Sequence, residues 1–282
     1  LRRCACHHVR SHEYPRSISR GTGDYRRLAR AAVGVEIRKD VRSMIVLGID
    51  TATELVSVAL VDGTEVLAAS ESQSDRRHAE DLTPMLQFVV QRAGLEFSEI
   101  DAVAVDVGPG LFTGMRVGIA AAQALAQVLS VPLVGIDSLD VLAAGVGSVD
   151  EYDLVVPVID TRRREVAWAL HRTHGDGSIR RVAPLKVGTM EDLLAAVRER
   201  SQPCLFVGAH ALSQEEQIRT DLGPQAWTVG FAGSAPRHPH ARLVASLGHA
   251  RLLRGADDLP VVQPMYLRDA DAEINWTTRS TR

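Results

Sequence analysis

The sequence is poor in several residue types, and each shortage excludes a class of protein. Cysteine occurs three times in 282 residues, at Cys4, Cys6 and Cys204, which is too few for a disulfide framework and suits a reducing cytoplasm. Aromatic residues make up only 4%, so stacking platforms for single-stranded nucleic acid are not expected. No apolar run approaches the roughly 20 residues that a membrane helix needs. We therefore expect a cytoplasmic protein without a membrane partner.

Charge is divided unequally along the chain. The total is 32 Lys+Arg against 35 Asp+Glu, a formal net charge of −3. Residues 1–43 hold 11 basic and 4 acidic residues (+7), which leaves 21 basic and 31 acidic residues (−10) in 44–282. Because affinity for nucleic acid depends on phosphate neutralisation, the acidic body predicts weak unaided binding to nucleic acid. A hydrophobic content of 45% predicts a globular chain with a substantial core.

The basic segment 1–43 precedes the first strong strand pattern, which opens at Met44. Three interpretations compete: a translated upstream stretch or misplaced start, a nucleic-acid-binding arm, and an Arg-rich transit peptide. We favour the first, because the fold can begin with the strand at Met44 and then needs no contribution from the segment. Four acidic residues are too many for a transit peptide. Residues 1–43 are thus expected to be disordered or a start-site artefact. A native peptide from this range, found by mass spectrometry, would contradict that expectation.

From Met44 onward strands and helices alternate, which predicts an α/β protein. In the first half the pattern predicts strands at 45–49, 55–61, 66–70, 102–107 and 133–136, and helices at 82–93, 114–129 and 138–144. In the second half it predicts strands at 154–159, 165–171, 179–187 and 204–207, and helices near 189–199 and 241–254. Pro84 is expected in the first turn of its helix, and Ser138 is expected to cap the helix 138–144.

The two halves match each other at an offset of 110 residues. Ile49-Asp50-Thr51 aligns with Ile159-Asp160-Thr161, and the strand that follows each turn also matches. This predicts a duplication, with an N-terminal lobe at 44–146, a C-terminal lobe at 147–268 and a tail at 269–282. Two such lobes resemble the actin, heat-shock-chaperone and sugar-kinase (ASKHA) superfamily. That resemblance implies two turns that face each other across a cleft and hold nucleotide phosphates.

Two features have the chemistry of phosphate-binding loops. The Asp-Thr turns offer carboxylates and hydroxyls at strand ends, and the glycine-rich connection 108–116 leads into a helix whose N-terminus attracts anions. Thr113 is expected to cap that helix, although no Walker-type Gly-Lys-Ser/Thr follows. The alternative is a set of tight turns that satisfy their own backbone. The candidate vestigial nucleotide or phosphate loops comprise Asp50, Thr51, Thr53, Gly108, Pro109, Gly110, Thr113, Gly114, Asp160 and Arg162.

Patterns of metal ligands and of activated nucleophiles are missing from 44–282. No histidine pair there has the i, i+4 spacing of a helical metal site; His78, for example, has Leu82 at that spacing. Cys204 lies in an apolar strand without an identifiable base partner. We therefore expect neither a catalytic residue nor a metal site in this chain.

Six stretches of the chain form a recognisable set: LGIDTATELVSVAL at 47–60, HAEDLTPML at 78–86, VGPGLFTGMRVGIAAAQALA at 107–126, GIDSLDVLA at 135–143, PVIDTRRREVAWAL at 157–170 and PMYLR at 264–268. Together they resemble the TsaB (YeaZ) family of bacterial tRNA threonylcarbamoyladenosine proteins. Three positions depart from the family pattern: Leu111 stands where Ser is usual, Thr161 where Ala is usual, and Ala167 in the place of an aromatic residue.

The resemblance implies a non-catalytic dimerisation and scaffold subunit of the N6-threonylcarbamoyladenosine (t6A) synthesis complex. Its partners would be the catalytic paralogue TsaD, which modifies adenosine 37 of ANN-decoding tRNAs, and the ATPase TsaE. The chain would form a homodimer when alone, would meet tRNA only through the complex, and would require no cofactor, with ATP or ADP bound at the complex interface. The alternatives are an ATP-dependent sugar-kinase-like phosphotransferase, which lacks a recognisable base, and a glycoprotease-type metallopeptidase, which lacks metal ligands.

Pairing in that family uses the two helices that correspond to 82–93 and 114–129. Both carry apolar stripes here, and part of each stripe is expected to face the lobe's own sheet. The candidate interface residues are Leu82, Met85, Leu86, Val89, Met115, Ile119 and Ala122.

Overall fold

The structure is a computed structural model that describes residues 44–73, 77–147, 149–162, 164–174, 178–225, 227–233, 237–255 and 262–265. These residues all belong to one compact unit, Ser43–Arg282. The expectations for the basic segment 1–43 and for the tail 269–282 fall outside the described residues and stay predictions.

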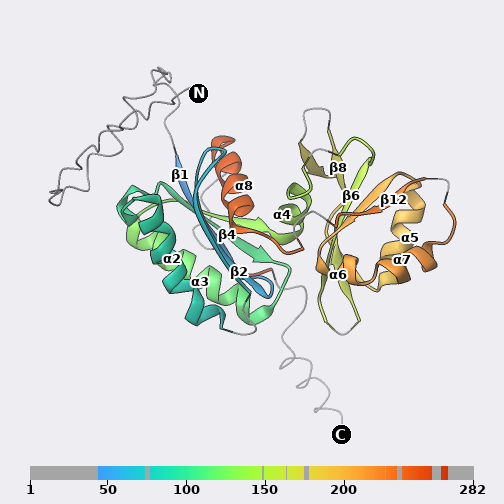
Figure 1. The fold of residues 1–282 in the computed structure, drawn as a ribbon, viewed down its shortest axis with the longest axis horizontal. Helices are drawn as coiled ribbons and strands as arrows, with labels where there is room; N and C mark the ends of the chain where they lie inside the picture. The colour runs from blue at the N-terminus through green and yellow to red at the C-terminus, as the bar shows by residue number, and fades with distance from the viewer. Residues whose placement is uncertain are drawn as a thin grey trace, which may run out of the picture. The chain divides into compact units, whose positions relative to one another are not determined.

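The first half of this unit contains five strands and the helices between them. They are β1 (Ile45–Asp50), β2 (Leu55–Asp62), β3 (Glu65–Gln73), α2 (His78–Ala93), the 3-10 helix η1 (Phe97–Glu99), β4 (Ala102–Gly108), α3 (Phe112–Leu129), β5 (Leu133–Asp137) and α4 (Ser138–Ala144) (Figure 1). The second half contains β6 (Leu154–Asp160), β7 (Val166–Trp168), β8 (His171–Thr173), β9 (Ile179–Arg181), β10 (Lys186–Gly188), α5 (Met190–Arg200), β11 (Cys204–Val207), α6 (Ala209–Ser213), α7 (Glu215–Leu222), β12 (Val229–Phe231) and α8 (Ala241–Leu253).

The two halves build sheets of the same topology. The first sheet has the strand order β3-β2-β1-β4-β5, and the second has β10-β7-β6-β11-β12, with β8 paired to β6 and β9. In both sheets the first two pairings along this order are antiparallel and the last two are parallel. The same order and directions are what a duplication produces. The predicted fold class, α/β with two related lobes, is confirmed.

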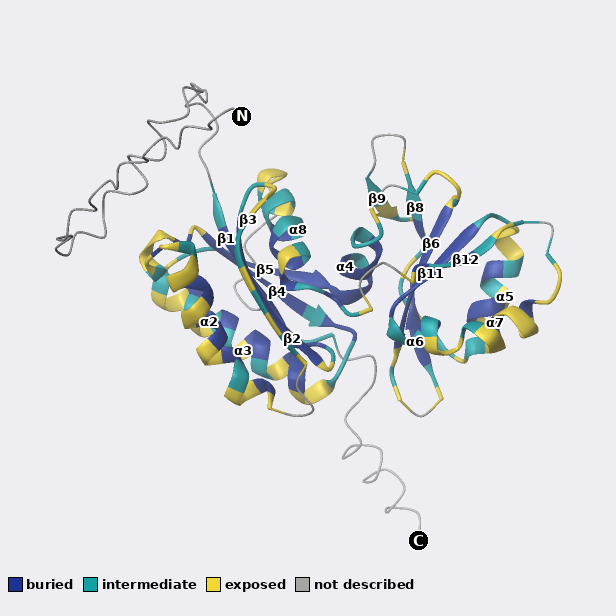
Figure 2. Cartoon of the chain, viewed as in Figure 1, coloured by how far each residue is buried: buried dark blue, intermediate teal, exposed yellow. Residues whose placement is uncertain are grey.

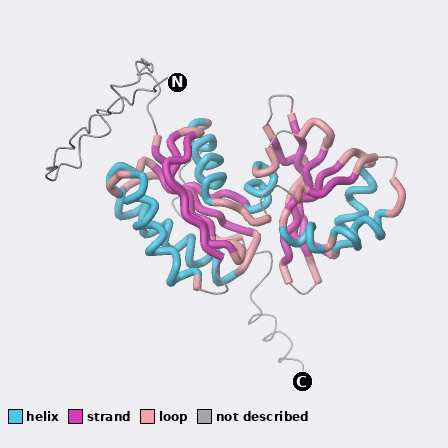
Figure 3. Tube along the Cα trace, viewed as in Figure 1, coloured by secondary structure: helices cyan, strands magenta, loops and turns pink. Residues whose placement is uncertain are grey.

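Each sheet is covered on one face by helices of its own half and on the other face by the last helix of the opposite half (Figure 3). Helix α8 packs Val244 and Ala245 on Val46 and Ala104 of the first sheet. Helix α4 lies in one hydrophobic cluster with β6 and β11 of the second sheet. The two exchanged helices therefore tie the lobes together.

The exchange requires a close approach at Gly48 in β1. A Cβ there would lie 2.1 Å from the carbonyl oxygen of Ala241, at the start of α8. We predict that Gly48→Ala lowers the free energy of unfolding by about 1–3 kcal/mol, because the backbone of α8 has to move away. Urea denaturation measures this. Gly233→Ala is the control, since a Cβ at Gly233 meets nothing within 4 Å; equal stability of both variants would contradict the packing.

Helices α2 and α3 bury their apolar stripes in the first lobe (Figure 2). All seven residues proposed from the sequence as interface residues belong to that core: Leu82, Met85, Leu86, Val89, Met115, Ile119 and Ala122. The interface prediction is therefore wrong for these side chains, because the lobe's own sheet already covers them. Of the helices in the described residues, none is both long and apolar enough to cross a membrane.

Two helix starts differ from the prediction. Helix α2 begins at His78, four residues before the apolar pattern, because the buried His78 ring bonds the Thr53 carbonyl at 2.8 Å. Pro84 is consequently inside the helix rather than in its first turn. Asp137, not Ser138, is the N-cap of α4, and its carboxylate accepts a hydrogen bond from the Leu139 N–H.

Candidate functional site

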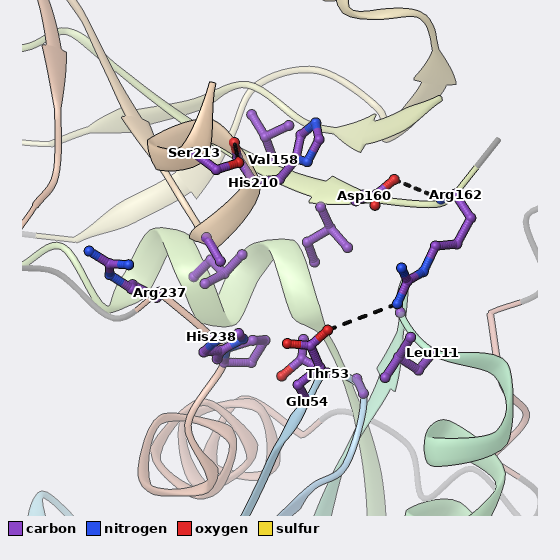
Figure 4. A pocket seen from close by; sticks show the side chains of 16 residues that line it. Thr53, Glu54, Leu111, Val158, Asp160, Arg162, His210, Ser213, Arg237 and His238 are labelled. Carbon is purple, nitrogen blue, oxygen red and sulfur yellow. Dashed lines mark hydrogen bonds and ion pairs between the residues drawn. The ribbon is translucent and has the colours of Figure 1, made fainter. Parts of the chain in front are cut away.

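A cavity of about 380 Å³ lies between the two lobes, where the turns after β1 and β6 approach each other (Figure 4). We call it the interlobe cavity. Residues of both halves line it: Ala52, Thr53, Glu54, Gly110, Leu111 and Leu142 from the first, and Val158, Ile159, Asp160, Arg162, Ala209, His210, Ser213, Arg237, His238 and Pro239 from the second. The sequence repeat thus leads to one shared cavity.

The two Asp-Thr turns share a local geometry but not an environment. The Asp50 carboxylate accepts a hydrogen bond from the Ala52 N–H at 2.8 Å, and the Asp160 carboxylate accepts one from the Arg162 N–H at 2.8 Å. Asp50 and Thr51 are completely buried, whereas Asp160 is exposed and lines the cavity. Of the two predicted carboxylates, the second is therefore the one that a ligand in the cavity can reach.

The glycine-rich connection 108–116 packs directly against the turn that follows β1. The Leu111 N–H donates to the Ala52 carbonyl at 2.7 Å, and the Thr51 hydroxyl donates to the Gly114 carbonyl at 2.8 Å. A Cβ at Gly110 would lie 2.1 Å from the Ala52 carbonyl oxygen, and one at Gly114 would lie 2.2 Å from that of Thr51. These glycines permit close backbone packing between loop and turn, while Ala52, Gly110 and Leu111 still line the interlobe cavity.

The other loop residues take structural positions. Gly108 and Pro109 are buried at the end of β4. Leu111 is the N-cap of α3 and makes no side-chain capping bond. Thr113 is an exposed residue within the first helical turn, so the prediction that it caps the helix is wrong.

A second buried carboxyl, Asp106, pairs with Asp50 and was not predicted from the sequence. Its Oδ1 accepts hydrogen bonds from the Gly108 N–H at 2.7 Å and from the Ser138 hydroxyl at 2.5 Å. Burial, and then the charge of Asp106, raise the pKa of Asp50 well above its usual value, and burial raises the pKa of Asp106 to about 7. The second oxygen of each carboxyl, Oδ2, is buried without a hydrogen-bond partner among the described residues, and both pKa values are raised, so we infer that the pair retains a proton near neutral pH. In the sequence, this buried carboxyl could have been suspected from the single aspartate within the apolar run 102–107.

An ion-pair cluster anchors α4 to the second lobe. The Arg181 guanidinium contacts the carboxylates of Asp137 and Asp140, each at 2.7 Å, and His171 Nε2 lies 2.8 Å from Asp140. Burial raises the pKa of Asp137; for Asp140, the bonds to His171 and Arg181 outweigh burial and lower the pKa. These charges connect α4 with β8 and β9 and do not line the interlobe cavity.

The side chains of Arg162 and Glu54 approach each other across the cavity (Figure 4). Arg162 Nη2 lies 3.9 Å from Glu54 Oε1, and the two side chains are 66% and 52% exposed. An ion pair this long and this exposed stabilises the protein by about 0–1 kcal/mol. Arg162 also has a φ of 67°, a backbone conformation that costs a non-glycine residue roughly 1–3 kcal/mol. The turn thus holds Arg162 in a strained conformation that its ion pair does not explain.

The described residues contain no group of three or more His, Cys, Asp or Glu side chains placed to hold a metal ion. Cys204 is buried in β11, and burial raises the pKa of its thiol to about 12, so it is not a thiolate at neutral pH. Neither a metallopeptidase site nor a reactive thiol is therefore formed by this part of the chain.

Comparison with known proteins agrees with the two-lobed fold. The chain matches the family model for TsaD, tRNA N6-adenosine threonylcarbamoyltransferase, over residues 65–276. The tRNA threonylcarbamoyladenosine biosynthesis protein TsaB of Bacillus subtilis (strain 168) is 30% identical over 234 residues, which cover 83% of this chain and 98% of that protein. TsaB of Escherichia coli (strain K12) is 38% identical over 134 residues, 48% of this chain and 58% of that protein.

Solved structures give the same result. A Pseudomonas aeruginosa protein described as similar to the peptidase YeaZ superposes with a TM-score of 0.66 at 28% identity, covering 80% of this chain and 100% of that one. The structure of YeaZ from Pseudomonas aeruginosa superposes with a TM-score of 0.63 at 26% identity, covering 79% of this chain and 100% of that one. The chain belongs to the family that the TsaD model describes and, within it, to the TsaB (YeaZ) proteins.

Proposed function

We propose that this chain is a non-catalytic subunit of the cytoplasmic complex that makes t6A at adenosine 37 of ANN-decoding tRNAs. In that complex it supports threonylcarbamoyl transfer by the catalytic paralogue TsaD. The name of the Bacillus subtilis relative supports a role in t6A biosynthesis. The observation that carries the non-catalytic role is the closure of the first turn: Asp50 and Thr51 are completely buried, and the glycine-rich loop packs its backbone against that turn.

The burial of the first turn also determines whether a nucleotide phosphate can bind there. A phosphate has no access to Asp50 or Thr51, so we propose that the chain requires no cofactor of its own. ATP or ADP used by the complex would bind where this chain meets its partners, TsaD and the ATPase TsaE. A sugar-kinase-like activity is not favoured, because the buried pair of Asp50 and Asp106 is out of reach of a substrate hydroxyl.

The docking surface that we propose lies on the exposed faces of α2 and α3, which we call the outer stripe. On α3 it consists of residues four apart, all exposed: Phe112, Arg116, Ala120, Ala124 and Val128. Side chains four apart are neighbours on a helix but shift by about 40° at each step, so these five form a continuous line that winds around the exposed side of α3. The two alanines place small side chains in the middle of this line, so a partner helix can approach closely there. We propose the outer stripe as the interface in place of the seven buried residues that the sequence pattern predicted.

Aromatic and aliphatic groups on the outer stripe have the properties of interface anchors. Phe88 of α2 is 49% exposed, Phe112 is 47% exposed and Val128 is 80% exposed. The Arg116 guanidinium carbon lies 3.7 Å from the centre of the Phe112 ring. Aromatic and arginine side chains are enriched at interface hot spots. The outer stripe therefore suits TsaD when it is present and a second copy of this chain when it is not.

Co-purification tests this proposal. Tagged TsaD is expected to retain this chain as a stoichiometric heterodimer, and light scattering is expected to show a dimer for the chain alone. TsaD that does not retain the chain, at micromolar concentrations of both proteins, would contradict the subunit role. Retention together with threonylcarbamoyl transfer by the isolated chain would contradict the non-catalytic role instead.

A further inference from the structure

Among the described residues, the lining of the interlobe cavity holds two acidic and two arginine side chains. Its lining includes the carboxylates Glu54 and Asp160 and the guanidinium groups of Arg162 and Arg237. A nucleoside triphosphate brings several negative charges, and two carboxylates in the lining would repel them without an excess of cations to compensate. The balance of charge instead suits a ligand that is itself neutral overall but carries one group of each sign.

Seven of the described residues that line the cavity are apolar, and we call them the apolar floor. Its members come from both lobes: Ala52, Leu111, Leu142, Val158, Ile159, Ala209 and Pro239. A volume of about 380 Å³ falls within the range of small-molecule sites, which combine an apolar lining with a few polar groups. The floor therefore suits an aliphatic side chain rather than a second charged group.

Three features of Glu54, Arg162 and His238 indicate that these side chains are available to a ligand. Arg162 and Glu54 are 3.9 Å apart, beyond hydrogen-bond distance, and the Arg162 backbone has a φ of 67°. His238 lies beside Glu54 in Figure 4, and burial lowers the pKa of its imidazole. Within the described part of the chain, neither ring nitrogen of His238 has a hydrogen-bond partner. Strained residues that project polar groups into a cavity are a feature of ligand sites.

We propose that the interlobe cavity binds a small zwitterion, an α-amino acid or a dipeptide with an aliphatic side chain. Its carboxylate pairs with the Arg162 guanidinium, its ammonium group pairs with the Glu54 carboxylate, and its side chain lies on the apolar floor. Two charge-assisted hydrogen bonds then replace one long, solvent-exposed ion pair. Because Glu54 and Arg162 come from different lobes, the ligand bridges them. This site goes beyond the proposed subunit role and does not depend on it.

Isothermal titration of the isolated chain tests the site with L-leucine and L-leucyl-L-leucine as probes. At least one of them is expected to bind with a millimolar or lower Kd. L-leucinamide lacks the carboxylate and N-acetyl-L-leucine lacks the ammonium group, so each is expected to bind at least tenfold more weakly than L-leucine. Binding of neither zwitterion, equal binding of the blocked derivatives, or tighter binding of ATP would each overturn the proposal.

Substitutions locate the binding. Arg162→Gln and Glu54→Gln are each expected to weaken zwitterion binding at least tenfold with an unchanged melting temperature. Arg164→Gln is the matched control, because Arg164 is an exposed arginine of the same turn, with a φ of 65°, that does not line the cavity. Equal affinity of the Arg162→Gln and Arg164→Gln variants would place the ligand elsewhere. Neither readout involves TsaD, so failure here leaves the subunit role intact.

Discussion

Val128→Glu is expected to abolish the pairing of this chain with TsaD, and its self-pairing, while leaving the fold intact. Val128 is 80% exposed on α3, so a carboxylate is tolerated in the free chain. In a dimer the same carboxylate would be buried between apolar helices, where an unpaired charge costs several kcal/mol. We expect at least a hundredfold loss of affinity, measured by titration with TsaD, and a comparable loss of t6A formation at limiting protein concentration.

The matched control is Val182→Glu. Val182 is an exposed valine, 39% exposed, between β9 and β10 of the second lobe, away from the outer stripe. This variant is expected to pair with TsaD as the natural chain does. Ile119→Glu is expected to unfold the first lobe instead, because Ile119 is a core residue. Normal pairing by Val128→Glu would show that the outer stripe is not the interface.

The stability of the chain is expected to fall between about pH 4 and pH 7 because of the pair Asp50 and Asp106. Both carboxyls have a raised pKa in the folded protein, so the native state holds a proton that the unfolded chain releases above pH 4. The stabilisation is therefore fully present below the unfolded pKa of about 4 and is lost as the pH rises through about 7. One retained proton corresponds to about 1.4 kcal/mol per pH unit.

Urea denaturation across this pH range measures the effect against Asp50→Asn. The amide keeps the acceptor for the Ala52 N–H and can donate a hydrogen bond to Asp106 in place of the shared proton. This variant is therefore expected to lose most of the slope and to exceed the natural chain in stability at pH 8. Asp160→Asn, in the equivalent but exposed turn, is expected to keep the slope. Identical slopes for the natural chain and Asp50→Asn would contradict the shared proton.

Much of the fold could be predicted because buried strands are short apolar runs that stop at a polar residue. Ile45–Asp50 and Leu154–Asp160 are such runs, and their common Asp-Thr ending also revealed the duplication. The exchange of α4 and α8 between the lobes could not be predicted. A helix's apolar period shows that one face is buried, but not which sheet covers that face.

The interface residues were wrongly predicted for the same reason: an apolar pattern does not show which surface covers it. Leu86 and Ile119 have the spacing of a docking face, and the lobe's own sheet satisfies that pattern completely. The exposed Phe88 and Val128 are isolated apolar residues in the sequence and become a surface only when α2 and α3 are placed side by side. Local pattern cannot provide that placement.

For the candidate site, the residue types were predictable and their accessibility was not. Asp50 and Asp160 occur in nearly identical local sequences and form the same turn. They differ in solvent accessibility. The connection after β4 packs its glycine backbone against the turn that holds Asp50 and covers that turn. Asp106 was missed because one carboxylate in an apolar strand has no partner until β1 and β4 pair in parallel.

The central claim, that the chain is a required but non-catalytic subunit, is tested most directly by a tRNA modification assay with components omitted. Purified TsaD, TsaE, this chain, a threonylcarbamoyl donor and an ANN-decoding tRNA are combined, and t6A is measured by mass spectrometry of the digested tRNA. We expect t6A with the full set, and none when this chain is omitted or when it is the only protein present. Formation of t6A by this chain alone, or undiminished formation without it, would contradict the role of a required, non-catalytic subunit.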